Sequence, residues 1–243
     1  MVQLTLYQFE LCPYCHKVKA GLELKQVAYT KVEVNPMSKK EIQKFPVPEA
    51  GRRKVPILEF GDDYQRESGD ILRRLDSLTP GTRSLWPDVV SDQDRINEIN
   101  TWVDEHLTQI LPTVLYGTWS EAIHAAKLTA QTSNFSRFDN MKVSLFGSVI
   151  MRMIAKRILK RRGEGKTPHE LFQEQLDILE TYIGDGPYIG GAQPNMADAA
   201  AHGPLMCVRA FPAFAHVEER PRVIEWFDRI TALRQVEAAS TAA

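Results

Sequence analysis

The stretch LTLYQFELCPYC, residues 4–15, decides the fold of this chain. The alternating polarity of residues 4–9 predicts a β-strand, and the apolar spacing that begins at Val18 predicts a helix. Cys12 and Cys15 therefore lie between a strand and a helix N-terminus, where free N–H groups and the helix dipole favour a thiolate. This placement predicts thiol–disulfide or thiol-transfer chemistry, with Cys12 as the exposed nucleophile and Cys15 as the shielded resolving thiol.

A zinc site is the alternative interpretation of the two thiols. Structural zinc needs four ligands, and the sequence has no second Cys-x-x-Cys pair, since the third cysteine, Cys207, stands alone in an apolar segment. The histidines are scattered without the spacing of metal ligands. We therefore expect no metal site.

Composition and charge restrict the class of protein. The 243 residues are 43% hydrophobic and 25% charged, as in a globular protein, and the net charge of −1 gives no general attraction to nucleic acid. Three cysteines are too few for a secreted disulfide scaffold. The apolar stretch at residues 143–151 is about half of the ~20 residues that a membrane span needs. We expect a cytoplasmic protein with no signal peptide, no membrane span and no nucleic-acid partner.

The first 78 residues predict an α/β domain of thioredoxin-like order. Three further strands are expected at residues 29–34, 54–60 and 64–66. Helices are expected to begin at Ser38, in a capping box with Glu41, and at Ser68. Two strands joined through a helix form a parallel pair, whereas the last two strands form a hairpin.

Residues 79–92, rich in Pro, Gly, Ser and Asp, are interpreted as a linker, and residues 93–243 as an all-helical domain. A buried apolar stripe is expected along residues 96–111, ended or kinked by Pro112. Asn195 is expected to cap a helix of small residues. A second buried stripe is predicted from Leu145, Phe146, Val149, Ile150, Met153, Ile154 and Ile158.

The densest basic run follows that second stripe. It comprises Lys156, Arg157, Lys160, Arg161 and Arg162. Cations in the last turns of a helix stabilise its dipole, and this is the interpretation that we favour. Binding to a membrane surface or to an anionic ligand is the alternative.

Two dipeptides add possible contacts near the thiols. A cis bond at Val55-Pro56 would turn the backbone of Val55 outward to pair with a peptide, although an ordinary edge proline is the simpler interpretation. Glu67-Ser68 opens a helix, with Ser68 as its cap. Its first N–H groups suit a carboxylate and Glu67 suits an ammonium, although plain capping explains the pair as well.

Taken in order, CPYC, KVPI (54–57), Glu67-Ser68 and a helical domain resemble the glutathione transferase superfamily. VEVNP (32–36), AKRILK (155–160) and GGAQPN (190–195) resemble its prostaglandin E synthase type two branch. The resemblance implies that Val55, with Pro56 cis, pairs with the cysteinyl part of glutathione and that Glu67 and Ser68 hold the γ-glutamyl end. It also implies a homodimer.

The sequence departs from that branch within the motif region. Phe9 stands where a tyrosine is expected, so a phenolic donor is missing, and Tyr14 replaces a phenylalanine, as in bacterial glutaredoxins. The resemblance therefore supports general glutathione–thiol chemistry for this chain better than it supports prostaglandin isomerisation. A substrate pocket is expected between the domains, lined by Phe9, Tyr14 and apolar side chains of the first helices after the linker.

We therefore expect a glutathione-dependent thiol enzyme, with glutathione as co-substrate, acting on a small hydrophobic electrophile or disulfide. The alternatives are a prostaglandin-synthase-like isomerase and a carrier of glutathione or of haem. The resemblance implies that haem would be held through the glutathione thiolate, and no local haem-ligand motif exists. The catalytic residues are predicted to be Cys12 and Cys15. The substrate-binding residues are predicted to be Phe9, Pro13, Tyr14, Lys54, Val55, Pro56, Glu67 and Ser68.

Overall fold

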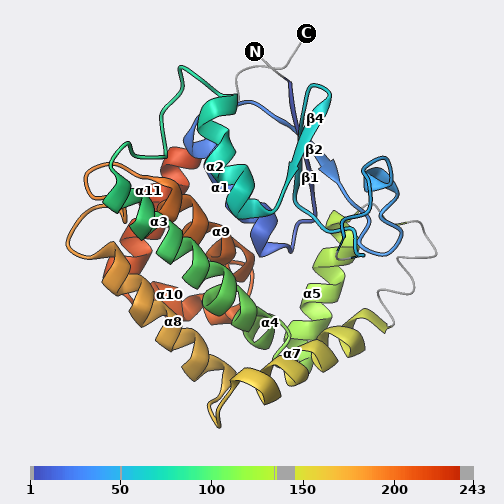
Figure 1. Cartoon of the computed structure of the whole chain (residues 1–243). Helices are drawn as coiled ribbons and strands as arrows, with labels where there is room; N and C mark the ends of the chain where they lie inside the picture. Colours follow the sequence, from blue (N-terminus) through green and yellow to red (C-terminus); the bar gives the residue numbers. More distant parts are fainter. Residues whose placement is uncertain (1–2, 50, 134, 136–145, 236–243) are drawn as a thin grey trace.

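The chain forms an α/β part of thioredoxin-like order followed by an all-helical part (Figure 1). The structure is a computed structural model that describes residues 3–49, 51–133, 135 and 146–235. Within these ranges no helix has the length and apolar content needed to cross a membrane.

The α/β part is a four-stranded mixed sheet with the strand order β2-β1-β3-β4. The sheet pairs β1 with β2 in parallel, whereas β3 is antiparallel to both β1 and β4. The expected parallel pair and hairpin are thus confirmed. The elements are β1 (Leu4–Gln8), α1 (Pro13–Leu24), β2 (Thr30–Glu33), β3 (Ile57–Phe60), β4 (Asp63–Arg66) and α2 (Ser68–Leu78).

The helical part packs onto α1 through α9, whose alanines at positions 199–201 are fully buried. A Cβ atom at Gly203 would lie 2.4 Å from the backbone nitrogen of Lys17, so only glycine permits this approach. The elements are α3 (Val90–Trp102), α4 (Thr108–Leu115), α5 (Trp119–Thr132), α7 (Ser148–Arg162), α8 (Pro168–Ile183), α9 (Met196–Val208), α10 (Ala215–Glu218) and α11 (Pro221–Arg234).

The capping box predicted for Ser38 and Glu41 is wrong. Residues Lys40–Ile42 form only a short 3₁₀ turn without a side-chain cap. The side chain of Asn35 accepts hydrogen bonds from the N–H groups of Met37 and Ser38, and Glu41 accepts one from the N–H of Asn35. Asn35 therefore forms an Asx-type turn, and the Glu41 carboxylate that was expected to pair with the cap residue Ser38 pairs with Asn35 instead.

Pro112 does not end its helix, because α4 continues to Leu115. The break in the expected long helix occurs earlier, at a π-helical turn over Val103–Leu107 between α3 and α4. Such turns insert an extra residue into the helical ladder and re-aim the side chains that follow. Here the turn carries Asp104 toward the α/β part.

The second apolar stripe is not buried. Phe146, Ile150 and Met153 are 62%, 56% and 66% exposed, and Val149 and Ile154 are also exposed. Helix α7 instead buries Ser148 and Ala155 as it packs on α4 and α5. Small residues allow closer helix approach than large ones, which explains the choice of face. Leu145 lies outside the described residues.

The capping box at Asn195 is confirmed. Its side chain accepts from the N–H of Ala197, and the buried carboxylate of Asp198 accepts from the N–H of Asn195. Asp198 also accepts from the N–H groups of Ile189 and Gly190 and from the indole of Trp226. This carboxylate therefore ties the preceding loop and α11 to the start of α9.

Candidate active site

The two thiols of the CPYC motif occupy different environments at the start of α1. Cys12 is the N-cap residue and is partly exposed, whereas Cys15 is buried. Hydrogen bonding from the Cys15 thiol, with help from nearby backbone N–H groups, lowers the pKa of Cys12 against the opposing effect of burial. Burial, followed by the neighbouring Cys12, raises the pKa of Cys15. The pair therefore presents one partly exposed thiol of lowered pKa and one buried thiol of raised pKa.

The Val55-Pro56 peptide bond is cis and directly precedes β3. The carbonyl oxygen of Val55 lies 4.0 Å from the sulfur of Cys12. The backbone carbonyl just before β3 thus lies beside the nucleophile, where an extended peptide could pair with it.

The chain enters α2 through Glu67, whose φ of +58° is in the left-handed region. The cap position is Glu67 and not Ser68, so the predicted Ser68 cap is wrong, and neither side chain makes a capping hydrogen bond. A non-glycine residue with positive φ is uncommon and often marks a ligand site. The first N–H groups of a helix have no intrahelical partner, and here Ser68 and Gly69, at the start of α2, line a cavity together with Val55.

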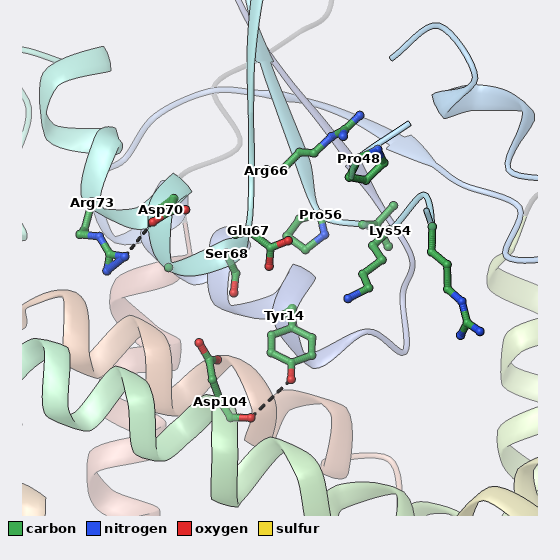
Figure 2. Close-up of a pocket in the computed structure, with 13 residues that line it drawn as sticks. Tyr14, Pro48, Lys54, Pro56, Arg66, Glu67, Ser68, Asp70, Arg73 and Asp104 are labelled. Atoms are coloured by element: carbon green, nitrogen blue, oxygen red, sulfur yellow. Dashed lines mark hydrogen bonds and ion pairs between the residues drawn. The ribbon is translucent and has the colours of Figure 1, made fainter. Parts of the chain in front are cut away.

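A cavity of about 360 Å³ brings most of the predicted binding residues together (Figure 2). It contains Tyr14, Lys54, Val55, Pro56, Glu67 and Ser68. Three acidic and four basic side chains contribute to its wall, which makes it suited to a zwitterionic ligand. The lining residues not predicted from the sequence are Pro48, Arg52, Arg66, Gly69, Asp70, Arg73 and Asp104.

Phe9 lies in a second cavity, of about 260 Å³, which shares only Lys54 and Val55 with the first. Apolar side chains dominate this smaller cavity, with cations from Lys39, Arg53 and Lys54. Pro13 lines neither cavity and serves as the first residue of α1. The expectation of one apolar pocket lined by both Phe9 and Tyr14 is therefore not met by these two cavities.

Asp104 is a site residue that the sequence analysis missed. Its carboxylate, delivered by the π-helical turn, lines the larger cavity and lies 2.5 Å from the ammonium of Lys17. Asn100 also accepts from Lys17, at 2.8 Å. Burial lowers the pKa of Lys17, and Asp104 opposes that shift. No local signal pairs Lys17 with a residue 87 positions away, so only the tertiary structure reveals this contact.

Tyr14 connects the motif to the helical part. Gln109 donates to its hydroxyl at 3.0 Å, and the hydroxyl lies 3.5 Å from the backbone carbonyl of Asp104, to which it donates (Figure 2). Burial, reinforced by Asp104, raises the pKa of Tyr14 to about 12. The phenol therefore stays protonated near neutral pH and acts as a hydrogen-bonding group at the cavity wall.

Comparisons with known proteins agree with this geometry. Residues 6–83 match the family described as "Glutathione S-transferase, N-terminal domain", and residues 169–229 match "Glutathione S-transferase, C-terminal domain". Prostaglandin E synthase 2 of Mus musculus is 27% identical, with 98% of this chain and 71% of that protein covered. Glutaredoxin 1 of Rickettsia felis is 38% identical over 32% of this chain and 81% of its own length.

The fold has close structural neighbours. Rice GST1, solved in complex with glutathione, matches with a TM-score of 0.64 and 20% identity over 96% of this chain and 90% of that one. The two halves match their respective family descriptions in the order in which the structure arranges them. The chain belongs to the glutathione S-transferase superfamily.

Proposed function

We propose that this protein is a glutathione-dependent thiol enzyme in which Cys12 performs thiol transfer on a small disulfide or electrophile. The observation that carries the proposal is the single partly exposed thiol of lowered pKa, 4.0 Å from the Val55 carbonyl, beside a charged cavity. The free state of all three cysteines suits a reducing compartment such as the cytoplasm.

The two cavities suggest how glutathione would lie. Because both include Val55, a tripeptide paired with the Val55 backbone would extend one end into each. The free N–H groups at the start of α2 suit the γ-glutamyl carboxylate, and Glu67 and Asp104 suit its ammonium. Lys54, at the boundary of the two cavities, suits the glycyl carboxylate. The cysteinyl sulfur would then face Cys12.

The proposed reduction proceeds in two thiol–disulfide exchanges. The Cys12 thiolate attacks the glutathionyl sulfur of a mixed disulfide, so that a Cys12–glutathione disulfide forms and the substrate leaves as a thiolate that takes a proton from water. A second glutathione thiolate then attacks the glutathionyl sulfur of this intermediate. That step releases glutathione disulfide and regenerates the Cys12 thiolate. Alternatively, Cys15 attacks the Cys12 sulfur of the intermediate, which forms a Cys12–Cys15 disulfide and releases glutathione, and two glutathione molecules then reduce that disulfide.

The alternatives gain no support from the site. The lining residues of the two cavities include no histidine, methionine or cysteine, so none of these side chains supports haem binding independently of glutathione. A prostaglandin-type isomerase would need a donor where Phe9 offers only a hydrocarbon ring. Thiol transfer by Cys12 is therefore the function that we propose.

The decisive experiment compares single-cysteine variants in glutathione-dependent reduction of a small mixed disulfide. Cys12→Ser is expected to lose at least about 100-fold in kcat/KM, because the attacking atom is removed. Cys15→Ser is expected to keep activity within about tenfold, since glutathione resolves the intermediate. Cys207→Ser serves as the control, because Cys207 is a buried core residue. A Cys12→Ser enzyme as active as the wild type would refute the proposal.

The pH dependence of thiol alkylation gives a second test. Because the pKa of Cys12 is lowered, its rate of reaction with iodoacetamide should reach a plateau at a pH below the usual thiol range. Cys15→Ala removes the stabilising hydrogen bond, so the plateau should move to higher pH and the rate at neutral pH should fall severalfold. An unchanged profile in Cys15→Ala would show that Cys15 does not tune the nucleophile.

A further inference from the structure

Helix α7 lies along the lower edge of the molecule in Figure 1. The side chains on its outward face are unusual for a protein surface. Its first half exposes large apolar side chains at helical spacing, and the same spacing then continues into basic side chains. The apolar residues are Phe146, which precedes α7 by two positions, and Val149, Ile150, Met153 and Ile154 within it, and the basic ones are Arg157, Lys160 and Arg161. We call this set the α7 strip.

The apolar half of the strip has no partner in the described part of the chain that buries it. Exposed fractions range from 42% at Val149 to 66% at Met153, while the opposite face of α7 packs on α4 and α5. Phe146 to Ile154 span about 12 Å along the helix axis. Contiguous apolar surface of this kind marks an interaction site in a soluble domain.

The charge of α7 indicates the chemistry of that partner. Its fifteen residues include six basic side chains and no aspartate or glutamate, in a chain whose net charge is −1. Among the described residues, no ion pair involves a cation of α7. Arg162 donates only to the backbone carbonyl of Glu105. The partner should therefore offer both an apolar layer and a dense array of negative charge.

A second copy of this chain fits the strip poorly. A two-fold contact through α7 would bring two acid-free, cation-rich helices together, and like charges would meet or be buried. Lysine is depleted from the cores of protein interfaces for this reason. An anionic lipid surface instead accepts apolar side chains at the acyl boundary and cations among its phosphates.

We propose that the α7 strip is a docking surface for an anionic lipid bilayer. Phe146, Ile150 and Met153 insert at the acyl boundary, while Lys160 and Arg161 contact the headgroup phosphates with their long side chains. The contact is peripheral and reversible, since a single short strip buries limited apolar area. It involves none of the residues that line the two cavities that meet at Val55.

The test is sedimentation of the full chain with unilamellar vesicles of phosphatidylglycerol and phosphatidylcholine in equal parts, compared with pure phosphatidylcholine. We expect binding to the anionic vesicles that weakens as salt is raised. Lys160→Gln with Arg161→Gln should lower the partition coefficient at least about tenfold. Ile150→Ser with Met153→Ser should lower it to a similar extent.

Matched controls change the same kinds of residue elsewhere on the surface. Val89→Ser with Val90→Ser removes exposed apolar groups at the start of α3, and Lys31→Gln with Lys40→Gln removes exposed cations. Both controls should bind as the wild type does, and all variants should retain thiol activity.

Three outcomes would overturn the proposal. The first is equal sedimentation with anionic and neutral vesicles, and the second is equal loss of binding in the controls. The third is a wild-type dimer in gel filtration that Ile150→Ser with Met153→Ser converts to a monomer, with no vesicle binding. That result would assign the strip to a second copy of the chain.

Discussion

Helices α9 and α7 belong to the same helical part but differ in whether their apolar side chains are buried or exposed. Every residue of α9 except Met206 is buried, and Gly203 lies against the backbone of α1 at Lys17. Helix α7 is rich in Ile, Met and Val, yet Val149, Ile150, Met153 and Ile154 are exposed. The helix with the smaller side chains thus forms the central contact of the molecule, and the helix with the larger ones lies at its edge.

The difference shows that helical spacing predicts which residues share a face but not which face is buried. Close packing of α9 on α1 requires small side chains, and the same requirement selects Ser148 and Ala155 as the inner face of α7. The larger side chains of α7 therefore stay exposed, where they can contact the proposed lipid surface. Three substitutions test this contrast between α9 and α7.

The largest effect is expected for Gly203→Val on α9. A Cβ atom there would lie 2.4 Å and 2.6 Å from backbone atoms of Lys17, which cannot rotate away. We expect a loss of about 4 kcal/mol in the free energy of unfolding, measured by urea denaturation, because overpacking against backbone forces α9 off α1. Ser120→Val, at an exposed position of α5, should change it by less than about 0.5 kcal/mol. A loss below 1 kcal/mol for Gly203→Val, by the same scale, would mean that α9 does not need this close approach.

A smaller effect is expected for Asp198→Ala, at the N-terminus of α9. The substitution leaves three backbone N–H groups and the Trp226 indole without their acceptor, all of them at or near the buried core. Thermal and urea denaturation should show a loss of about 3 kcal/mol. Asp228→Ala, on the exposed side of α11, is the control and should be close to neutral. Equal stability of the two variants would contradict the role assigned to Asp198.

The smallest effect is expected for Met153→Ser on α7. Since Met153 is 66% exposed, its loss should change the free energy of unfolding by less than about 0.5 kcal/mol. Leu205→Ala on α9, where the side chain is fully buried, should lose about 3 kcal/mol. If Met153→Ser were as destabilising as Leu205→Ala, α7 would bury its apolar strip in solution and the comparison would fail.

Much of the fold was predictable because its signals are local. Residues 4–24 alternate and then change to helical spacing, and β1 and α1 form there. The thioredoxin-like order followed from the parallel pair and the hairpin. The predicted Ser38 cap failed because Asn35 competes for the same backbone groups, which a propensity rule does not weigh.

The candidate site was predictable in part for the same reason. The motif at Cys12 and the dipeptides Val55-Pro56 and Glu67-Ser68 were located from local sequence, and the larger cavity contains both dipeptides. Asp104 and Lys17 were not found, because each looks like an ordinary charged residue of a helix. Their role at the site depends on the ion pair between them, which joins the α/β part to the helical part.

The sequence by itself determined the thiol motif, its position at a strand–helix junction, and the order of strands and helices, because these depend on residues within a few turns of one another. Where Asp104 lies and which face of α7 is exposed became evident only from the folded chain. Those properties depend on distant segments competing to exclude water from the same small volume, and no local pattern records the outcome of that competition.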